Sequence, residues 1–229
     1  MPARKKEPED LPAKKELALE VIDRLKKEYP DAGCTLDYDH AWQLLVSVRL
    51  AAQCTDARVN IVVEDLFARY PSVAALAAAE PEDIEAIVKP CGLGHSKARD
   101  ISACMRMLRD KYNCQVPTTF EELLALPGVG RKSANLIMGD VFGKPAIVTD
   151  THCIRLCNKI GLVDGIKEPQ KVEMALWKII PPEEGSDLCH RFVMHGRAVC
   201  NARKPECEKC CLNDLCRYAR EQSGADTAQ

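Results

Sequence analysis

Aromatic residues are scarce in this 229-residue chain, since Phe, Trp and Tyr make up 5% of it, whereas 46% of its residues are hydrophobic. A sizeable core is therefore available, enough for one large domain or two small ones. No apolar run is long enough to span a bilayer, and the polar N-terminal segment has no signal-sequence character. We therefore expect a soluble, cytoplasmic protein with no membrane partner.

Positive charge is not in excess, because the formal net charge is -2. Composition alone thus does not indicate nucleic-acid binding, and any basic surface must come from an uneven distribution of charge. The segment 191–220 is locally basic. It contains Arg191, Arg197, Arg203, Lys204, Lys209, Arg217 and Arg220 against Glu206, Glu208 and Asp214.

Strand pairs, hairpin turns and tandem repeats are missing, whereas apolar residues recur at helical spacing. The sequence predicts an all-α protein with about ten helices. Residues 1–11 have no periodicity and are expected to form a disordered arm. We expect Asp39, Ser96 and Thr119 to cap helices. The helix after Asp39 is so apolar that it must be buried on every side, and the polar residues 51–56 that follow it suggest a surface cleft.

The stretch L-P-G-V-G-R-K-S-A at 126–134 joins two of the expected helices. Gly128 and Gly130 allow positive φ and leave the backbone bare, so the N–H groups around Val129 and Arg131 could point at one phosphate. The pattern is typical of a helix-hairpin-helix, a module that binds the nucleic-acid backbone without reading its sequence.

Lys132 lies in the first turn of the helix after this hairpin. The positive end of the helix dipole disfavours a cation there, and partial burial would disfavour the charge further. A lysine that loses its proton easily is a candidate Schiff-base nucleophile. The alternative is one more cation that contacts phosphate.

Thirteen cysteines form an odd set in a chain without a signal sequence, which argues against a disulfide scaffold. Most, such as Cys104 and Cys153, lie in apolar helical patterns and are expected to be reduced core residues. Four others have the spacing C-x6-C-x2-C-x5-C in a basic loop. They are Cys200, Cys207, Cys210 and Cys216. Four thiolates suit zinc or an iron-sulfur cluster, and spacing leaves both open. The adjacent Cys211 is interpreted as a non-ligand.

Three features occur in order: the hairpin, the motif V-T-D-T-H around Asp150, and the four-cysteine pattern. Three further segments accompany them: A-A-Q-C-T-D at 51–56, C-G-L-G-H-S-K-A at 91–98 and H-G-R-A-V-C-N-A-R-K-P at 195–205. In this combination the chain resembles the endonuclease III family of bifunctional DNA glycosylases, within the helix-hairpin-helix superfamily. The resemblance covers residues 17–220.

The resemblance implies two helical domains. A six-helix barrel at 34–144 would contain the hairpin, and an iron-sulfur cluster domain would combine residues 12–33 with residues 145–229. The four cysteines would hold a [4Fe-4S] cluster. Lys132 and Asp150 would face each other across a cleft.

The resemblance also assigns DNA contacts. Gln53 would fill the gap that an extruded base leaves in the duplex, and Leu93 would wedge beside it. Without the resemblance, a hydrogen-bonded glutamine at a helix end and a buried loop leucine are the simpler interpretations. His152 is expected to be a pocket or packing residue, and Arg203 and Lys204 are expected to meet phosphates.

The implied reaction is base excision repair of oxidised pyrimidines or abasic sites in double-stranded DNA, carried out by a monomer at the bacterial nucleoid. Neutral Lys132 would attack C1′ of the deoxyribose, and the resulting Schiff base would allow β-elimination of the 3′-phosphate. Asp150 would stabilise positive charge at C1′ or assist deprotonation of the lysine. Alternatively it caps the helix that starts at Thr151, a role compatible with catalysis.

Three other functions compete with this one. An adenine-mismatch glycosylase shares the cluster but characteristically lacks the lysine and carries a further C-terminal domain. A non-catalytic DNA-binding or redox-sensing module would not require both Lys132 and Asp150. A zinc-bound helical adaptor would lack the visible absorbance of an iron-sulfur protein.

Overall fold

The structure, a computed structural model, describes residues 10–226, and every regular element in that range is a helix. The all-α fold class is therefore confirmed. The expected arm lies outside the described residues except for its last two, and Leu11 already begins the first helix. None of the helices in the described range has the length and apolar character needed to cross a membrane.

Two α-helices of the described range were not expected. The short α4 (Val73–Ala78) is rich in alanine, and α12 (Arg217–Asp226) is mostly polar. Neither has an apolar stripe long enough to be detected by periodicity, because α4 is shorter than two turns and α12 has few apolar side chains.

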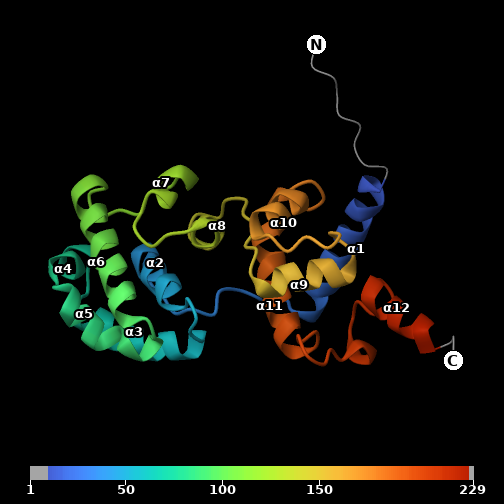
Figure 1. The fold of residues 1–229 in the computed structure, drawn as a ribbon. Coiled ribbons are helices and arrows are strands. Elements are labelled where there is room, and N and C mark those ends of the chain that lie inside the picture. Colours follow the sequence, from blue (N-terminus) through green and yellow to red (C-terminus); the bar gives the residue numbers. More distant parts are fainter. Residues whose placement is uncertain (1–9, 227–229) are drawn as a thin grey trace, which may run out of the picture. The chain divides into compact units, whose positions relative to one another are not determined.

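The chain divides into two compact units (Figure 1). One consists of residues 34–144, and the other combines the residues up to Gly33 with those from Pro145 onward. Each unit is described separately below.

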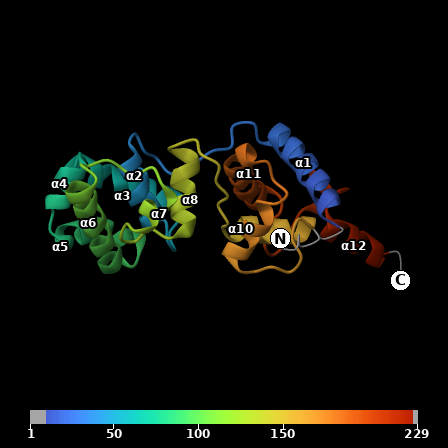
Figure 2. The ribbon, with the colours of Figure 1, turned by 90° about the horizontal axis from the view of Figure 1, so that it is seen from above.

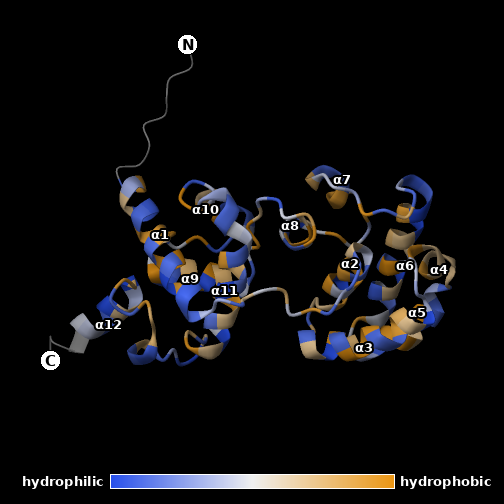
Figure 3. Ribbon diagram, turned by 180° about the vertical axis from the view of Figure 1, so that it is seen from behind, coloured by the Kyte–Doolittle hydropathy of each residue, from blue (hydrophilic) through white to orange (hydrophobic). Residues whose placement is uncertain are grey.

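The unit 34–144 is built around α6 (Gly94–Lys111), against which α4 and α5 (Pro81–Val88) pack. The other helices are α2 (Ala41–Leu50), α3 (Asp56–Arg69), the 3-10 helix η1 (Lys89–Cys91), α7 (Phe120–Leu124) and α8 (Arg131–Asp140). Its core is almost wholly aliphatic, and along helices such as α3 and α6 polar and apolar residues alternate around the axis (Figure 3).

Helix α2 has no exposed residue, as its apolar sequence predicts. Its N-cap is His40 and not the expected Asp39. The reason is the amide of Gln43, whose oxygen accepts hydrogen bonds from the backbone N–H groups of both Asp39 and His40, each at 2.8 Å. The Gln43 side chain thus satisfies the backbone N–H groups at the start of the helix, so a carboxylate cap is not needed.

Helix α6 begins two residues before the expected cap at Ser96, because Leu93 in a left-handed conformation is its N-cap. The hydroxyl of Ser96 instead accepts a hydrogen bond from Arg49 of α2. At α7 the expected cap is present, since Thr119 accepts from the backbone N–H of Glu122.

The second unit contains α1 (Leu11–Glu28), α9 (Thr151–Ile160), α10 (Pro169–Leu176), η2 (Pro182–Glu184), α11 (Gly185–Ala198), η3 (Cys207–Lys209) and α12. Helix α11 is central and packs against α9. It also packs against α1, which lies beside it in Figure 2. Helix α12, the last helix of the described residues, packs on α9, the helix that Asp150 precedes.

Candidate functional site

The hairpin at 126–130 packs against an ion pair between Arg49 of α2 and Asp100 of α6. Gly128 has φ +77°, and a Cβ at this position would lie 2.9 Å from Asp100 Cβ and 3.1 Å from Arg49 Cδ. Arg49 binds the Asp100 carboxylate through Nε at 3.0 Å and Nη2 at 2.8 Å. Gly128 is therefore required by both backbone conformation and space.

Gly130 differs from Gly128. Its backbone is extended, with φ −96° and ψ 176°, so the expectation of positive φ is correct only for Gly128. A Cβ on Gly130 would meet no atom of the protein within 4 Å. The bare backbone therefore faces open space at the N-terminus of α8, where the first N–H groups of the helix lack intrahelical partners. An anion can approach closely there.

Arg131 and Lys132 form the first turn of α8 and point in different directions. The Arg131 guanidinium lies 5.0 Å from the centre of the Phe120 ring, which ties α8 to α7. Lys132 is exposed, so the partial burial expected for it is absent from the structure. The buried face of α8 is formed by Ala134 and Ile137, and the helical period places Lys132 on the opposite side from Ala134.

Gln53 and Leu93 share two unusual properties. Both are non-glycine residues with left-handed backbone, at φ 57° and 51°, a conformation that costs about 1 kcal/mol or more. Both are also exposed, Leu93 to 57% of its maximum. The interpretation of Leu93 as a buried loop residue is therefore wrong, and Gln53 has no side-chain hydrogen bond within the described part of the chain. Surrounding structure must hold both turns.

Asp150 caps α9, as one interpretation of the sequence predicts. Its Oδ1 accepts a hydrogen bond of 2.7 Å from the backbone N–H of Cys153. This bond engages Oδ1 alone, and no other side-chain hydrogen bond or ion pair of Asp150 occurs among residues 10–226. The preceding backbone is fixed too, since Val148 N–H donates to Cys189 Sγ at 3.2 Å. The carboxylate is thus held rigidly, with Oδ2 available to a ligand.

His152 packs against α11. A Cβ on Gly196 would lie 2.4 Å from His152 Nδ1, so only glycine lets the ring come this close. Arg155 lies 3.2 Å from the same nitrogen and donates to the carbonyls of Gly196 and Cys200. Sequence reasoning did not single out Arg155, because one arginine in an amphipathic helix resembles any exposed cation. Here it joins the Asp150 helix to the cysteine loop.

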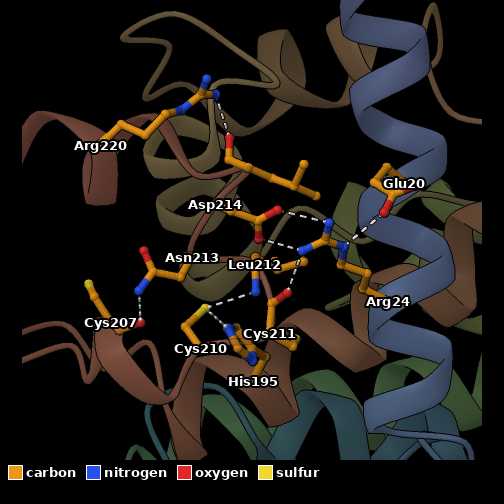
Figure 4. A network of polar contacts seen from close by, with 11 residues as sticks. Glu20, Arg24, His195, Cys207, Cys210, Cys211, Leu212, Asn213, Asp214 and Arg220 are labelled. Atoms are coloured by element: carbon orange, nitrogen blue, oxygen red, sulfur yellow. Dashed lines mark hydrogen bonds and ion pairs between the residues drawn. The ribbon is translucent and has the colours of Figure 1, made fainter.

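The four cysteines of the C-x6-C-x2-C-x5-C pattern line one partly open cavity. Lys159 and Tyr218 also line it, and the ammonium of Lys159 lies 3.9 Å from the centre of the Tyr218 ring. Cys211 does not line this cavity. Its carbonyl instead accepts from Arg24 of α1, whose guanidinium also binds Asp214 (Figure 4).

The cysteine cavity has donors directed at sulfur. The Leu212 N–H donates to Cys210 Sγ at 3.4 Å, and His195 Nε2 lies 3.3 Å from the same sulfur (Figure 4). His195 Nδ1 is hydrogen bonded to Tyr29 at 3.0 Å. Burial raises the pKa of Cys210 to about 12, so an ionised sulfur there needs a positive partner. Four cysteine thiols lining one cavity are the donor set of a metal centre. Among the residues that the structure describes, however, no three His, Cys, Asp or Glu side chains are arranged closely enough to hold a metal ion.

Three of the seven cations of the segment 191–220 are already paired with carboxylates. Arg191 is buried and pairs with Asp187, Lys209 pairs with Glu206, and Arg217 pairs with Asp164. Arg203 and Lys204 are exposed and have no ion pair with any described residue. The residue count therefore overestimated the free positive charge, which is present at Arg203 and Lys204.

A family model described as HhH-GPD superfamily base excision DNA repair protein matches residues 46–182. The chain is 44% identical to Endonuclease III of Synechocystis over 91% of this chain and 95% of that protein. It is 38% identical to Endonuclease III of Escherichia coli K12, over 87% and 94% of the two chains.

Solved structures agree with these sequence relatives. A trapped endonuclease III-DNA covalent intermediate matches with a TM-score of 0.86 and 41% identity, covering 91% of this chain and 98% of that one. A thermostable thymine-DNA glycosylase, at 22% identity and a TM-score of 0.81, shares the fold.

Proposed function

The chain belongs to the endonuclease III family, within the HhH-GPD superfamily of base excision DNA repair proteins, and on this premise we propose which residues carry its reaction and on which damage they act. It is a DNA glycosylase and abasic-site lyase of base excision repair. Its substrates are oxidised pyrimidines in double-stranded DNA and the abasic sites left after their removal. The observation that carries the assignment is the exposure of Lys132. It lies in the first turn of α8, two residues after Gly130, whose backbone faces open space.

Lys132 is the nucleophile. Its neutral amine attacks C1′ of the deoxyribose, the bond from C1′ to the base nitrogen breaks, and the base leaves with that electron pair and a proton. The bond to Nζ then becomes a Schiff base as the sugar ring opens. Loss of the C2′ proton followed by departure of the 3′-phosphate completes β-elimination. Because Lys132 is exposed in the free protein, bound DNA must exclude water from the amine during this step.

Asp150 is the carboxylate that acts on the same sugar. Its Oδ1 is held by the N-cap bond to Cys153, so Oδ2 has a fixed position with little freedom to reorganise. A rigid anion stabilises positive charge developing at C1′ and can accept a proton from the lysine. Lys132 and Asp150 belong to different units, and that they face one cleft is part of the proposal.

The DNA contacts fall into two classes. The hairpin residues Gly128 to Arg131 bind a backbone phosphate through main-chain N–H groups other than that of Val129, which donates to the carbonyl of Leu126. Arg203 and Lys204 supply unpaired charge for other phosphates. Gln53 and Leu93 enter the duplex, because both are exposed side chains on strained turns. His152 contributes a pocket wall beside Asp150, where its ring is fixed against Gly196.

The cysteine cavity belongs to a metal centre, and we assign it to a [4Fe-4S] cluster held by Cys200, Cys207, Cys210 and Cys216. Such a cluster would supply positive charge next to the sulfurs of Cys200 and Cys210, whose pKa is raised by burial. Its role in the proposal is structural, because the loop that it closes carries Arg203 and Lys204. We therefore assign the helix-hairpin-helix barrel to residues 34–144 and the cluster domain to residues 12–33 with 145–229.

The protein acts as a monomer on chromosomal DNA. We place it at the nucleoid in the cytoplasm of a bacterium, since the relatives named above are bacterial proteins.

The test is borohydride trapping on duplex DNA that contains thymine glycol. We expect a covalent adduct for the native chain and none for Lys132→Gln, with the rate of strand cleavage lower by a factor on the order of 10³ or more. Because Lys132 is exposed, the melting temperature of the variant should not change. Trapping on an abasic site alone would correct the damaged-base assignment, and trapping on neither substrate would refute the lysine mechanism.

A further inference from the structure

Lys97 is the largest fully buried side chain of the unit 34–144 and carries a charged group that the reaction does not use. It lies at the end of the first turn of α6. Its Nζ donates to the carbonyl of Leu50 at 2.8 Å and to the carbonyl of Cys91 at 2.8 Å. No carboxylate pairs with it anywhere in the described range, so backbone carbonyls alone hold this ammonium.

The two carbonyls come from places that matter for DNA contact. Leu50 is the last residue of α2, three residues before Gln53, and Cys91 is the last residue of η1, two residues before Leu93. A cation suits both positions, because the last carbonyls of a helix lack intrahelical donors and carry partial negative charge. The Lys97 side chain therefore links the backbone segments that precede the two exposed turns.

A second interaction links the same two turns. Burial, and after it the thiol of Cys54, which follows Gln53, raise the pKa of the Cys91 thiol to about 11. Gln53 and Leu93 are strained and exposed, so neither turn is held by packing of its own functional side chain. The two hydrogen bonds of Lys97 lie beneath both turns and connect their backbones.

We propose that Lys97 is a positioning residue that sets the distance between Gln53 and Leu93, and so prepares both side chains to enter the duplex together. The inference rests on the DNA roles of these two residues given under the proposed function. Burial of an ammonium without a carboxylate is costly for the fold, and desolvation lowers the pKa of Lys97. The gain is preorganisation, because two independent loops arrive at the DNA as one rigid element.

The test compares two substrates of the full-length protein. In a duplex with thymine glycol, the base must be extruded and the gap filled, whereas a single-stranded oligonucleotide with an abasic site requires neither step. Single-turnover rate constants for cleavage of both substrates are measured, and the ratio of duplex rate to single-strand rate is the readout. Active enzyme is counted by borohydride trapping on the single-stranded substrate, so misfolded protein does not enter the ratio.

Lys97→Met should lower this ratio roughly tenfold or more, because both carbonyl contacts are lost. Lys97→Gln, which retains one donor group, should lower it less and serves if the methionine variant does not fold. The matched control is Lys144→Met, since Lys144 also donates to a backbone carbonyl, that of Thr118, at 2.6 Å. Its ratio should equal that of the native chain.

Variants of Gln53 and Leu93 distinguish a failure of this inference from a failure of the proposed function. Gln53→Ala with Leu93→Ala should lower the ratio, and adding Lys97→Met to this double variant should lower it no further, since nothing remains to be positioned. If Lys97→Met reduces both rates in equal proportion while the double variant lowers the ratio, Lys97 is only structural and the inference is wrong. If the double variant leaves the ratio unchanged, the proposed DNA roles of Gln53 and Leu93 are wrong, and this inference falls with them.

Discussion

The two units present their candidate functional residues in opposite ways. In the unit 34–144, Gln53, Leu93 and Lys132 are exposed on turns and at a helix start. In the other unit, Asp150 is fixed by a cap bond and the four cysteines proposed as cluster ligands line one cavity. Under the proposed function, side chains of the first kind would gain their environment from bound DNA, whereas those of the second kind already have it from the protein.

This difference predicts how substitutions divide between function and stability. Changes at the exposed residues should alter rates or DNA binding and leave folding unaffected. Loss of the Asp150 cap or of any of the four cysteines of the second unit should affect folding as well, because these residues also complete structural contacts. Arg203 and Lys204 of that unit are exposed and should behave like the exposed residues of the unit 34–144. The largest effects on stability are therefore expected in the second unit, and a loss of the cap or of a cysteine ligand there that changes function alone would contradict this difference between the units.

The largest effect is expected at the cysteine cavity. Cys210→Ser should abolish the visible absorbance and bound iron of the purified protein and lower the stability of its unit by several kcal/mol, because cluster binding contributes directly to folding. Iron analysis and thermal unfolding measure both consequences. Cys211→Ser is the matched control, since Cys211 does not line the cavity. Equal iron loss in the two variants would contradict the ligand assignment.

Substitutions at Asp150 can separate its role as a helix cap from its proposed role in catalysis. Asp150→Asn keeps an N-cap oxygen and removes the charge, so the rate of cleavage should fall about 10²-fold or more while the melting temperature stays constant. Asp150→Ala should show the same kinetic loss and also lose about 1 kcal/mol of stability. Kinetics and thermal unfolding of the pair decide the matter. A fully active asparagine variant would limit Asp150 to capping.

The two hairpin glycines should respond differently to alanine. Gly128→Ala forces a left-handed alanine against Arg49 and Asp100 and should cost about 1–3 kcal/mol in the free energy of unfolding. Gly130→Ala meets no protein atom within 4 Å and should leave stability within about 0.5 kcal/mol, yet weaken binding to duplex DNA. Denaturant unfolding and a DNA titration measure the two outcomes. Unchanged DNA affinity in Gly130→Ala would contradict phosphate approach at this position.

The smallest effect concerns an exposed ion pair of the second unit. Hydrogen bonds from Lys14 and Arg217 lower the pKa of Asp164. A carboxyl with a lowered pKa adds stability above its ordinary pKa and loses it as the pH falls through the lowered value. Asp164→Asn should therefore cost less than about 1 kcal/mol near pH 7, since the pair is exposed, and nothing once the carboxyl is protonated.

Thermal unfolding of this variant as a function of pH gives the measurement. Asp65→Asn is the control, because Asp65 is exposed on α3 and has no ion pair among the residues described. If the difference between native chain and Asp164→Asn is the same at acid and neutral pH, the ion pair does not contribute to stability.

Local patterns accounted for much of the fold. Thr119 and Asp150 cap the helices that the sequence assigned to them, since N-cap bonds depend on three or four consecutive residues. At Asp39 and Ser96 the same reasoning failed. The amide of Gln43 and the left-handed Leu93 set those helix starts, and neither has a signal in a short window.

The sequence by itself determined the all-α class, the hairpin, the cysteine set and the family, because these depend on residue types at fixed spacing. Only the tertiary structure decided which of those residues are accessible. It showed that Lys132 and Leu93 are exposed, that Arg191 and Arg217 are paired internally, and that Lys97 joins two distant turns. Burial and pairing depend on segments far apart in the chain, so no local pattern encodes them.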